Sequence, residues 1–410
     1  MELKYSILIL LLLDFTVKGK DFKCATPKQF EENNASIIGQ DYKDYKSVKD
    51  IKLHEFLFEF GKELGHGSFG EVKEIKNVEP RIVIKKMIVD ESNEEEFERE
   101  ISTLRKLCKQ DKDSYANMVD CNFQAIASFY GCVVDNNTLF LFQEYLEQDL
   151  ASKEAKPFYQ NLNPVKKVEA MLDIIDKFIE IHEEDIIHSD IKPANIMTKG
   201  FAISNFKIID FGMANYPGGR FVGGSDGYLP PERYREMHSL QALGSYEDVF
   251  ALAMTFAGME EKFKPAHEEI AKGCFSDENY EDKCQKVITN GLIETFTVER
   301  KLSFLIPVLE KALNLNYKKR LETMKKFSIE LFKEFKNLEG SAKIIEAIKL
   351  AGNIYDVDGK SPSFWRNRLI PKQKGTQETF INTSAQPRDR TIKWVNRLAV
   401  KDPTKKLIFV

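Results

Sequence analysis

The sequence has few cysteines, no excess of either charge and no internal repeat. Six cysteines are spread over 410 residues without a CxxC pair, and this spacing predicts neither a zinc module nor a dense disulfide scaffold. The 60 basic residues nearly balance the 64 acidic ones, for a net charge of −4, so no global positive field favours nucleic acid as a partner. The absence of repeats and low-complexity tracts excludes solenoid and propeller folds.

What the sequence does contain is the composition of a large globular protein. Hydrophobic residues make up 42% and charged residues 30%, unlike a mainly disordered chain or a polytopic membrane protein. At about 150 residues per domain, the length predicts two to three packed units.

The N-terminus carries an unbroken aliphatic run over residues 7–13. Seven residues are too few to span a bilayer, so no transmembrane span is expected here. The run suits a secretory signal peptide over residues 1–19, and the protein would then be secreted or endomembrane, with its cysteines in oxidising conditions. The alternative is a native apolar segment of a cytoplasmic protein, or a wrongly assigned start codon, and the sequence favours neither reading.

The next part of the chain predicts a small antiparallel sheet with one helix. Residues 20–57 are polar without a clear period, which indicates an N-terminal extension. Strand-like patterns follow at 58–64, 71–75 and 81–87, and a further hairpin is expected around 133–143. Between them, Phe97, Ile101, Leu104 and Cys108 recur at helical spacing, and Ser92 with Glu95 has the spacing of a capping box.

Beyond residue 150 long amphipathic helical patterns take over, such as the one at 168–182. They predict a second, mainly helical lobe. The last part, 339–410, is expected to hold a helix at 342–350 and then a flexible tail or accessory segment with prolines among Lys and Arg.

Three glycines with GxGxxG spacing lie between the first two predicted strands, in Leu64-Gly65-His66-Gly67-Ser68-Phe69-Gly70-Glu71-Val72. Glycine tolerates positive φ and lets backbone N–H groups approach anionic oxygens closely. The spacing alone is a weak signal, since dinucleotide-binding turns and ordinary turns share it. The dinucleotide form opens a helix, however, whereas a strand follows here, so the pattern favours a hairpin that covers phosphate groups.

A lysine at the end of an apolar strand, Lys85, needs an anionic partner, because an unpaired buried ammonium carries a large desolvation cost. Glu100 lies on the same predicted helix face as Phe97 and Leu104 and is the expected partner. For these two residues taken alone, a surface lysine and an ordinary helix-face glutamate are the commoner outcome.

A polar loop framed by isoleucines spans 187–196 and contains Asp190, Lys192 and Asn195. A strand at 206–209 then leads into Asp210-Phe211-Gly212. Asn195 and Asp210 offer the hard oxygen ligands that Mg²⁺ prefers. A helix-ending loop and a glycine-terminated strand would explain either feature alone, but not their order and spacing together.

In this order the motifs resemble those of eukaryotic-type protein kinases. The resemblance covers residues 58–338 and rests on the glycine loop, Lys85, Glu100, the segment 188–195, Asp210-Phe211-Gly212, Pro230-Pro231-Glu232, Asp248 and Arg320. It implies an α+β, two-lobed fold, with a small antiparallel N-lobe sheet and one helix over 58–143. A larger, mainly helical C-lobe is implied over 147–338.

The resemblance implies ATP and Mg²⁺ as cofactors and protein substrates. Lys85, braced by Glu100, would hold the α- and β-phosphates. Asn195 and Asp210 would hold Mg²⁺, and Asp190 would orient the substrate hydroxyl. The residues implied to cover the phosphates are Leu64, Gly65, His66, Gly67, Ser68, Phe69, Gly70 and Val72.

Further roles follow from the same resemblance. Lys192 and Ser225 resemble the serine/threonine branch, with Lys192 neutralising the γ-phosphate. On the adenine side, Glu144 and Leu146 would contribute backbone groups and Asp149 would reach the ribose. The remaining roles fall to Gln143 as gatekeeper and to Glu232 with Arg320 as a buried ion pair.

One departure from the family pattern concerns regulation. Ser189 stands where many members carry an arginine that pairs with a phosphate on the activation segment. We therefore predict activity without phosphorylation of that segment, whose order must come from other contacts. Pro230, which replaces an alanine, is expected only to stiffen its turn.

Three functions compete at this point. An active serine/threonine kinase requires Lys85, Asp190 and Asp210, and all three are present. A pseudokinase scaffold usually lacks one of them, and a small-molecule kinase generally lacks the set formed by Ser225, Pro231-Glu232 and Arg320. The active kinase is favoured, while the protein substrate, the oligomeric state and any cysteine pairing do not follow from the sequence.

Overall fold

The computed structural model describes residues 60–67, 70–75, 81–109, 121, 123–135, 138–201, 203–235, 242–271, 280–298 and 302–335. These residues divide into two compact units, one up to residue 145 and the other from residue 146, with 124–126 belonging to the second. The predicted segments 1–19, 20–57 and 339–410 lie outside the described residues, as do Ser68 and Phe69.

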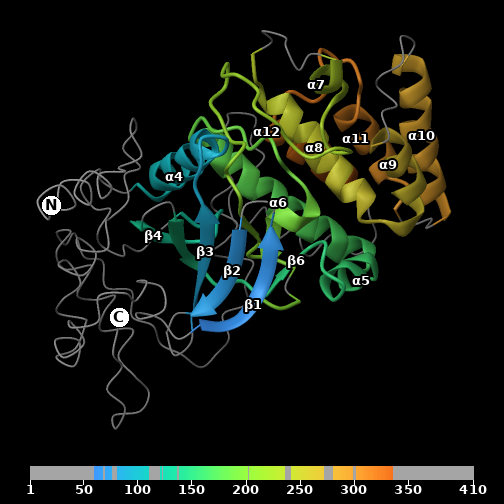
Figure 1. Ribbon diagram of the computed structural model, residues 1–410. Coiled ribbons are helices and arrows are strands. Elements are labelled where there is room, and N and C mark those ends of the chain that lie inside the picture. The colour runs from blue at the N-terminus through green and yellow to red at the C-terminus, as the bar shows by residue number, and fades with distance from the viewer. Residues whose placement is uncertain are drawn as a thin grey trace, which may run out of the picture. The chain divides into compact units, whose positions relative to one another are not determined.

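The first unit is built on a five-stranded antiparallel sheet with strand order β1-β2-β3-β5-β4. Figure 1 shows these strands in blue and teal. Their bounds are β1 Phe60–Gly67, β2 Gly70–Ile75, β3 Ile82–Ile88, β4 Phe129–Asp135 and β5 Thr138–Glu144. Apolar residues fill β3 and β5 because these strands are paired on both sides and largely buried. The predicted strands and hairpin are therefore confirmed.

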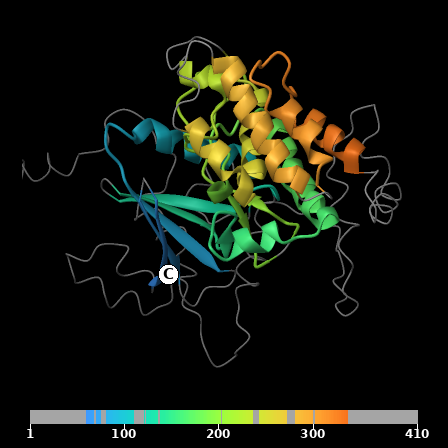
Figure 2. The ribbon, with the colours of Figure 1, turned by 90° about the vertical axis from the view of Figure 1, so that its right-hand side faces the viewer.

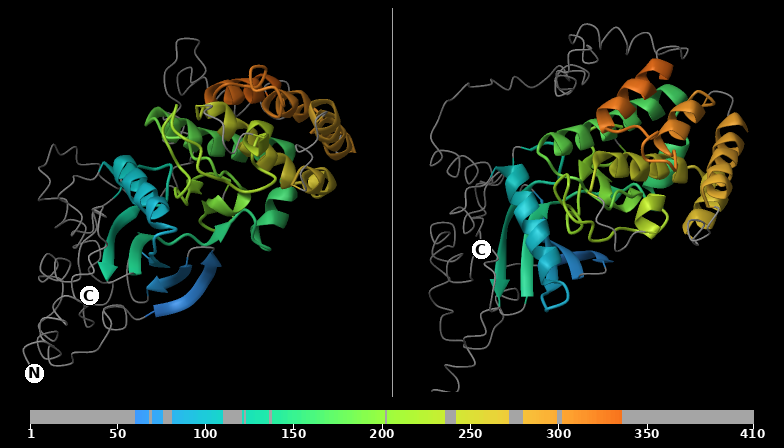
Figure 3. Two further views of the ribbon diagram at one scale, coloured as in Figure 1. Left: turned by 45° about the horizontal axis from the view of Figure 1, so that its top comes forward. Right: turned by 90° about the horizontal axis from the view of Figure 1, so that it is seen from above.

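One helix, α4 (Glu94–Cys108), packs beside this sheet, as the two views of Figure 3 show. Its buried face carries Phe97, Ile101 and Leu104, as their spacing predicts. The predicted capping box is wrong. The backbone N–H and hydroxyl of Ser92 both donate to Asp90 in the preceding turn, so the helix begins after Asn93 without a side-chain cap.

The second unit combines a three-stranded sheet with many helices. The sheet has the order β6-β7-β8, with β6 Gln148–Asp149, β7 Ile196–Thr198 and β8 Lys207–Ile208. The helices are α5 Ala155–Gln160, α6 Pro164–Glu183, η2 Pro193–Asn195, α7 Pro231–Arg235, α8 Ser245–Gly258, η3 Glu261–Phe263, α9 Lys264–Ala271, α10 Tyr280–Val298, α11 Leu305–Ala312 and α12 Met324–Phe335.

The core of the second unit is centred on α8, whose side chains from Glu247 to Ala257 are all buried. Helix α12 packs against both α6 and α8, and α11 packs against α8 and α10. Figure 2 shows α8, α10, α11 and α12 side by side in yellow to orange. The helix predicted at 168–182 is confirmed within α6, which starts with an Asn163 side-chain cap and Pro164. The predicted α+β architecture is therefore correct.

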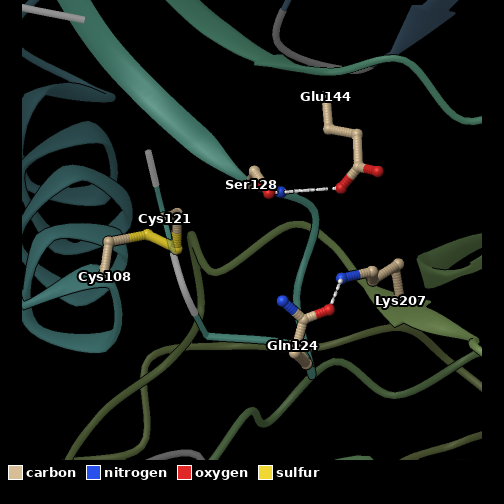
Figure 4. The surroundings of a disulfide bond; sticks show 6 residues. All are labelled: Cys108, Cys121, Gln124, Ser128, Glu144 and Lys207. Carbon is tan, nitrogen blue, oxygen red and sulfur yellow. Dashed lines mark hydrogen bonds between the residues drawn. A yellow bond between two sulfur atoms is a disulfide. The ribbon is translucent and has the colours of Figure 1, made fainter. Parts of the chain in front are cut away.

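Every cysteine among the described residues is in a disulfide. Cys108, the last residue of α4, is bonded to Cys121 (Figure 4), and Cys132 and Cys284 are also disulfide-bonded. The thin spread of cysteines along the sequence does not reveal this pairing, because the fold brings the partners together. As to membranes, none of the described helices has both the length and the apolar character needed for a crossing.

Candidate active site

In the first unit, the structure places Lys85 and Glu100 in direct contact. The Lys85 Nζ atom on β3 donates to both carboxylate oxygens of Glu100 on α4, each at 3.0 Å. The Glu100 side chain is only 3% exposed, so the pair is shielded from water on the carboxylate side. An ammonium held in this way presents a fixed positive charge at the sheet surface.

The turn between β1 and β2 depends on glycine at its second end. Gly67 pairs with Gly70 across the hairpin, and Gly65 pairs with Val72. Gly70 has a φ of 153°, and a Cβ atom built there would lie 1.9 Å from the backbone oxygen of Lys86 on β3. No other residue fits, so Gly70 sets how closely this hairpin approaches β3. Leu64, at the base of the turn, is 39% exposed.

At the end of β5, the Glu144 side chain serves the fold. Its carboxylate accepts hydrogen bonds from the backbone N–H of Ser128 at 3.2 Å and from the Ser128 hydroxyl at 3.3 Å (Figure 4). Its own backbone N–H donates to the Ser128 oxygen at 2.9 Å. The contact of the Glu144 backbone with adenine stays a prediction. The neighbouring Gln143 side chain is buried.

In the second unit, a lysine bridges an aspartate and a serine. The Lys192 Nζ atom donates to Asp190 Oδ2 at 2.8 Å and to the Ser225 hydroxyl at 2.7 Å. Asp190 Oδ2 also accepts from the amide of Asn195 at 3.1 Å. The other oxygen, Oδ1, is buried and accepts no hydrogen bond from any described residue.

The ionisation of Asp190 reflects these contacts. Burial raises the pKa of this carboxyl group, but Lys192, Ser225 and His188 together outweigh that effect and hold the pKa below its ordinary value. Asp190 is therefore a carboxylate at neutral pH.

The two residues predicted to bind metal lie on adjacent stretches of backbone. The N–H of Ile209 donates to the backbone oxygen of Asn195 at 3.1 Å, which brings Asp210 next to Asn195. The amide nitrogen of Asn195 is occupied by the Asp190 backbone oxygen at 2.8 Å, so the amide oxygen faces the other way. Asp210 has a φ of 67°, an uncommon conformation for a residue with a side chain.

This pair of oxygen ligands fits Mg²⁺. Magnesium is commonly held by one or two protein oxygens and completes its shell with water and phosphate oxygens. The described residues contain no cluster of three or more His, Cys, Asp or Glu side chains suited to a metal ion.

A buried carboxylate on α8 holds the polar loop in place. Asp248 accepts from the backbone N–H groups of His188 at 2.8 Å and Ser189 at 2.9 Å, and it contacts His182 Nε2 at 2.8 Å. Burial raises the pKa of Asp248, but the hydrogen bond to His182 and the interactions with His182 and His188 outweigh burial and lower it. The sequence matches Asp248 to the family but does not predict this role. The signal in the sequence is the acidic pair Glu247-Asp248 directly before an apolar run.

The fully buried imidazole of His188 links the loop to the strand before Asp210. Its Nε2 atom contacts the Ile209 backbone oxygen at 3.1 Å, and its Nδ1 atom accepts from the Asp190 N–H at 3.3 Å. The ring also packs 5.0 Å from that of Phe211. His188 therefore fixes the spacing between Asp190 and Asp210.

The segment 210–232 is anchored at its end by an ion pair. Arg320 donates from Nη1 and Nη2 to the two carboxylate oxygens of Glu232 at 2.7 and 3.1 Å, and both side chains are buried. The structure thus contains the pair that the sequence led us to expect. It also contains a second one, Arg233 with Glu247, which sequence reasoning missed.

The remaining predicted residues lie at the start of the second unit. Leu146 is 5% exposed. Asp149 on β6 accepts from the Ala151 N–H at 2.8 Å, and burial raises the pKa of its carboxyl group. The carboxylate thus has a local structural partner in addition to the role expected for it.

Comparison with known proteins agrees with this arrangement. The Protein kinase domain family matches residues 58–332. Aurora kinase from Eremothecium gossypii is 29% identical over 238 residues, which are 52% of this chain and 60% of that protein. A probable LRR receptor-like serine/threonine-protein kinase from Arabidopsis thaliana is 27% identical over 242 residues, covering 55% of this chain and 22% of the relative.

Dual specificity tyrosine-phosphorylation-regulated kinase 3 from Homo sapiens is 31% identical over 161 residues, covering 38% of this chain and 26% of that protein. In each of these three comparisons the chain covers less than two thirds of the relative's length. Family membership implies ATP as the phosphoryl donor and Mg²⁺ as its usual divalent ion. Because the family matches more than half of the sequence, we conclude that this chain belongs to the protein kinase family.

Proposed function

We propose that this protein transfers the γ-phosphate of ATP to serine and threonine hydroxyls of other proteins. The bridge from Lys192 to Asp190 and Ser225 is the observation that carries the proposal. It aligns a carboxylate acceptor with an ammonium at the place where a hydroxyl would lose its proton and negative charge would move toward the phosphate. The name of the Arabidopsis thaliana relative, which includes the words serine/threonine-protein kinase, supports this specificity.

The proposed division of labour follows the placement of each residue. Bound Mg²⁺ would neutralise phosphate charge, and Asn195 and Asp210 would hold it. Lys85, fixed by Glu100, would bind the α- and β-phosphates under the hairpin 64–72. Asp190 would accept the hydrogen bond of the substrate hydroxyl and orient it for attack. The backbones of Glu144 and Leu146 would contact adenine, and Asp149 the ribose.

Phosphoamino acid analysis tests the proposal directly. The purified chain is incubated with γ-labelled ATP, Mg²⁺ and a generic basic protein, and the labelled residues are identified. We expect phosphoserine and phosphothreonine, with at least a hundredfold loss in Asp190→Asn. The exposed Asp226→Asn serves as a matched control and should retain activity. Phosphotyrosine as the main product, or ATP binding without transfer, would contradict the proposal, and the second result would identify a scaffold.

We also propose that activity does not require phosphorylation of the activation segment. Serine at position 189 has no cation with which to pair a phosphate, and the described segment 210–232 already makes many contacts of its own. The test is to treat the purified protein with phosphatase and to measure transfer afterwards. Full activity is expected. A protein that is inert after this treatment and regains activity only when a residue in 213–229 is phosphorylated would contradict it.

A third proposal concerns the compartment. We propose that the protein folds in an oxidising compartment of the secretory route, because all four described cysteines are in disulfides and such bonds are rare in the cytosol. Protein isolated from its native cells is alkylated without reduction, and Cys108 and Cys121 are located by mass spectrometry. Linked, unalkylated cysteines and an N-terminus that follows the predicted signal peptide 1–19 are expected. Alkylated cysteines with an intact N-terminus would contradict this proposal.

A further inference from the structure

The activation segment is held by a buried arginine that lies outside the predicted machinery. Arg233 on α7 is 1% exposed, and its Nε and Nη2 atoms both donate to the carboxylate of Glu247. The ring of Phe221, in the middle of the segment, lies 4.8 Å from the Arg233 guanidinium carbon. An aromatic face over a desolvated guanidinium is an attractive contact.

The same arginine is linked to the loop that carries Asp190. Glu247 is the neighbour of Asp248, and Asp248 accepts from the backbone N–H groups of His188 and Ser189. Glu247 also accepts from the Gly244 N–H at 3.0 Å, which fixes the first turn of α8. At the N-terminus of α8, Glu247 therefore binds Arg233 beside the activation segment, and Asp248 binds the polar loop 187–196.

The activation segment packs closely around Ser189. A small cavity of about 10 Å³ is lined by Ser189, Phe221, Glu247 and Asp248 among others. Beside it the segment packs closely on the loop, since a Cβ atom at Gly224 would lie 2.6 Å from the Ser189 backbone oxygen. Glu247, which lines this cavity, is also the anionic partner of Arg233.

We propose that Arg233, neutralised by Glu247, is a positioning residue that orders the activation segment through Phe221. This carboxylate partner takes the place that a phosphate would hold in a segment ordered by phosphorylation. The inference rests on the proposed kinase function and deepens it, because it names the contact that makes the segment independent of modification. Ser225 lies four residues after Phe221 and contacts Lys192, so the order of the segment reaches the phosphoryl-transfer site.

The first experiment removes the aromatic contact alone. Phe221→Ala is compared with Val222→Ala, which truncates the next, exposed side chain of the same segment. We expect Phe221→Ala to lower kcat/KM for a peptide substrate about tenfold, from the loss of a desolvated cation–π contact. The KM for ATP should stay within twofold and the Tm nearly unchanged. Phe221→Trp should restore activity, because it keeps an aromatic face over the guanidinium.

The second experiment follows the order of the segment without using activity. The Gly218 N–H donates to the Leu243 oxygen at 2.8 Å, and the Leu243 N–H donates to the Gly219 oxygen at 3.2 Å. In Phe221→Ala, these two amides should exchange hydrogen at least tenfold faster, while the amides of α6 stay unchanged. The paired variant Arg233→Met with Glu247→Met, which leaves no buried charge alone, should give the same result.

The outcomes separate this inference from the proposed function. If wild-type protein transfers no phosphate but Phe221→Ala still speeds hydrogen exchange at the Gly218 and Leu243 amides, the kinase proposal fails and the positioning role stands. If wild-type protein is active and Phe221→Ala matches Val222→Ala in both peptide turnover and exchange, the positioning role is overturned.

Discussion

The pair formed by Lys85 and Glu100 shows how one carboxylate can decide the direction of a side chain. Lys85 is on β3, and its ammonium donates to both carboxylate oxygens of Glu100 at 3.0 Å. A neutral amide in place of Glu100 offers one acceptor instead of two and no charge. The ammonium would then sample other rotamers, which weakens its hold on phosphate oxygens.

Glu100→Gln should therefore raise the KM for ATP and lower kcat/KM for ATP between tenfold and a hundredfold, corresponding to about 1.4 to 2.8 kcal/mol. The measurement is a steady-state titration with ATP at a fixed peptide concentration. Glu95→Gln, an exposed change on the same helix, is the control and should leave both constants unaltered. Equal constants for the two variants would show that the pair does not position Lys85 for ATP.

Ser189 gives the second prediction at this scale. Ser189→Arg introduces the residue common in the family, but Ser189 is buried and the adjoining cavity of about 10 Å³ is far smaller than an arginine side chain. We expect at least a tenfold loss of kcat, because overpacking displaces the segment. Ser189→Ala should remain active. A Ser189→Arg variant as active as wild type would argue against the crowding described here.

At the scale of elements, helix α4 is anchored at two points, Glu100 and Cys108. Glu100 anchors its middle to β3, and two turns later Cys108 ties its last turn to Cys121. The disulfide joins residues separated by 13 positions. In the loop-entropy model, a closure of this length stabilises the folded state by about 3 kcal/mol.

The double variant Cys108→Ser with Cys121→Ser should lose about 3 kcal/mol in its free energy of unfolding. It should also raise the KM for ATP several-fold, because the end of α4 is then free to fray. Urea unfolding followed by circular dichroism measures the first effect, and ATP titration the second. The double variant leaves Cys132 and Cys284 untouched, which a reducing agent would not. Unchanged stability and unchanged KM would mean that packing alone holds α4.

The elements also show how far sequence reasoning reaches. Strand alternation and helical spacing located β2, β3 and α6, because apolar periodicity reflects burial directly. The capping box at Ser92 failed, since Asp90 competes for the same serine and pattern matching cannot weigh one local hydrogen bond against another. The contact of Lys85 with Glu100 could be predicted because helical spacing faced Glu100 inward. Arg233 with Glu247 could not, since only the tertiary fold brings α7 to the start of α8.

At the scale of the whole molecule, His267 makes the folding stability depend on pH. His267 on α9 is half-buried, its ring lies 4.9 Å from that of Tyr228, and its Nε2 atom has no hydrogen-bond partner among the described residues. Burial lowers the pKa of His267 below its ordinary value of 6.5, with Lys156 adding to the effect and Glu268 opposing it. The unfolded chain therefore takes up a proton at a higher pH than the folded protein does.

Because the folded pKa is the lower one, His267 costs no stability above pH 6.5, and stability falls as the pH drops below that value. We expect the Tm of wild-type protein to decline more between pH 7.5 and about pH 5 than that of His267→Gln. Thermal unfolding in a series of buffers at constant ionic strength provides the comparison. Parallel curves for the two proteins would assign the acid sensitivity to other groups.

The bond between Cys108 and Cys121 also bears on how this protein should be prepared. A bacterial cytosol keeps thiols reduced, so a recombinant sample made there would lack this bond and should show the raised KM for ATP expected of the double cysteine variant. Production through a periplasmic or eukaryotic export route would yield the crosslinked form. The choice of host would thus decide which of the two forms a kinetic assay describes.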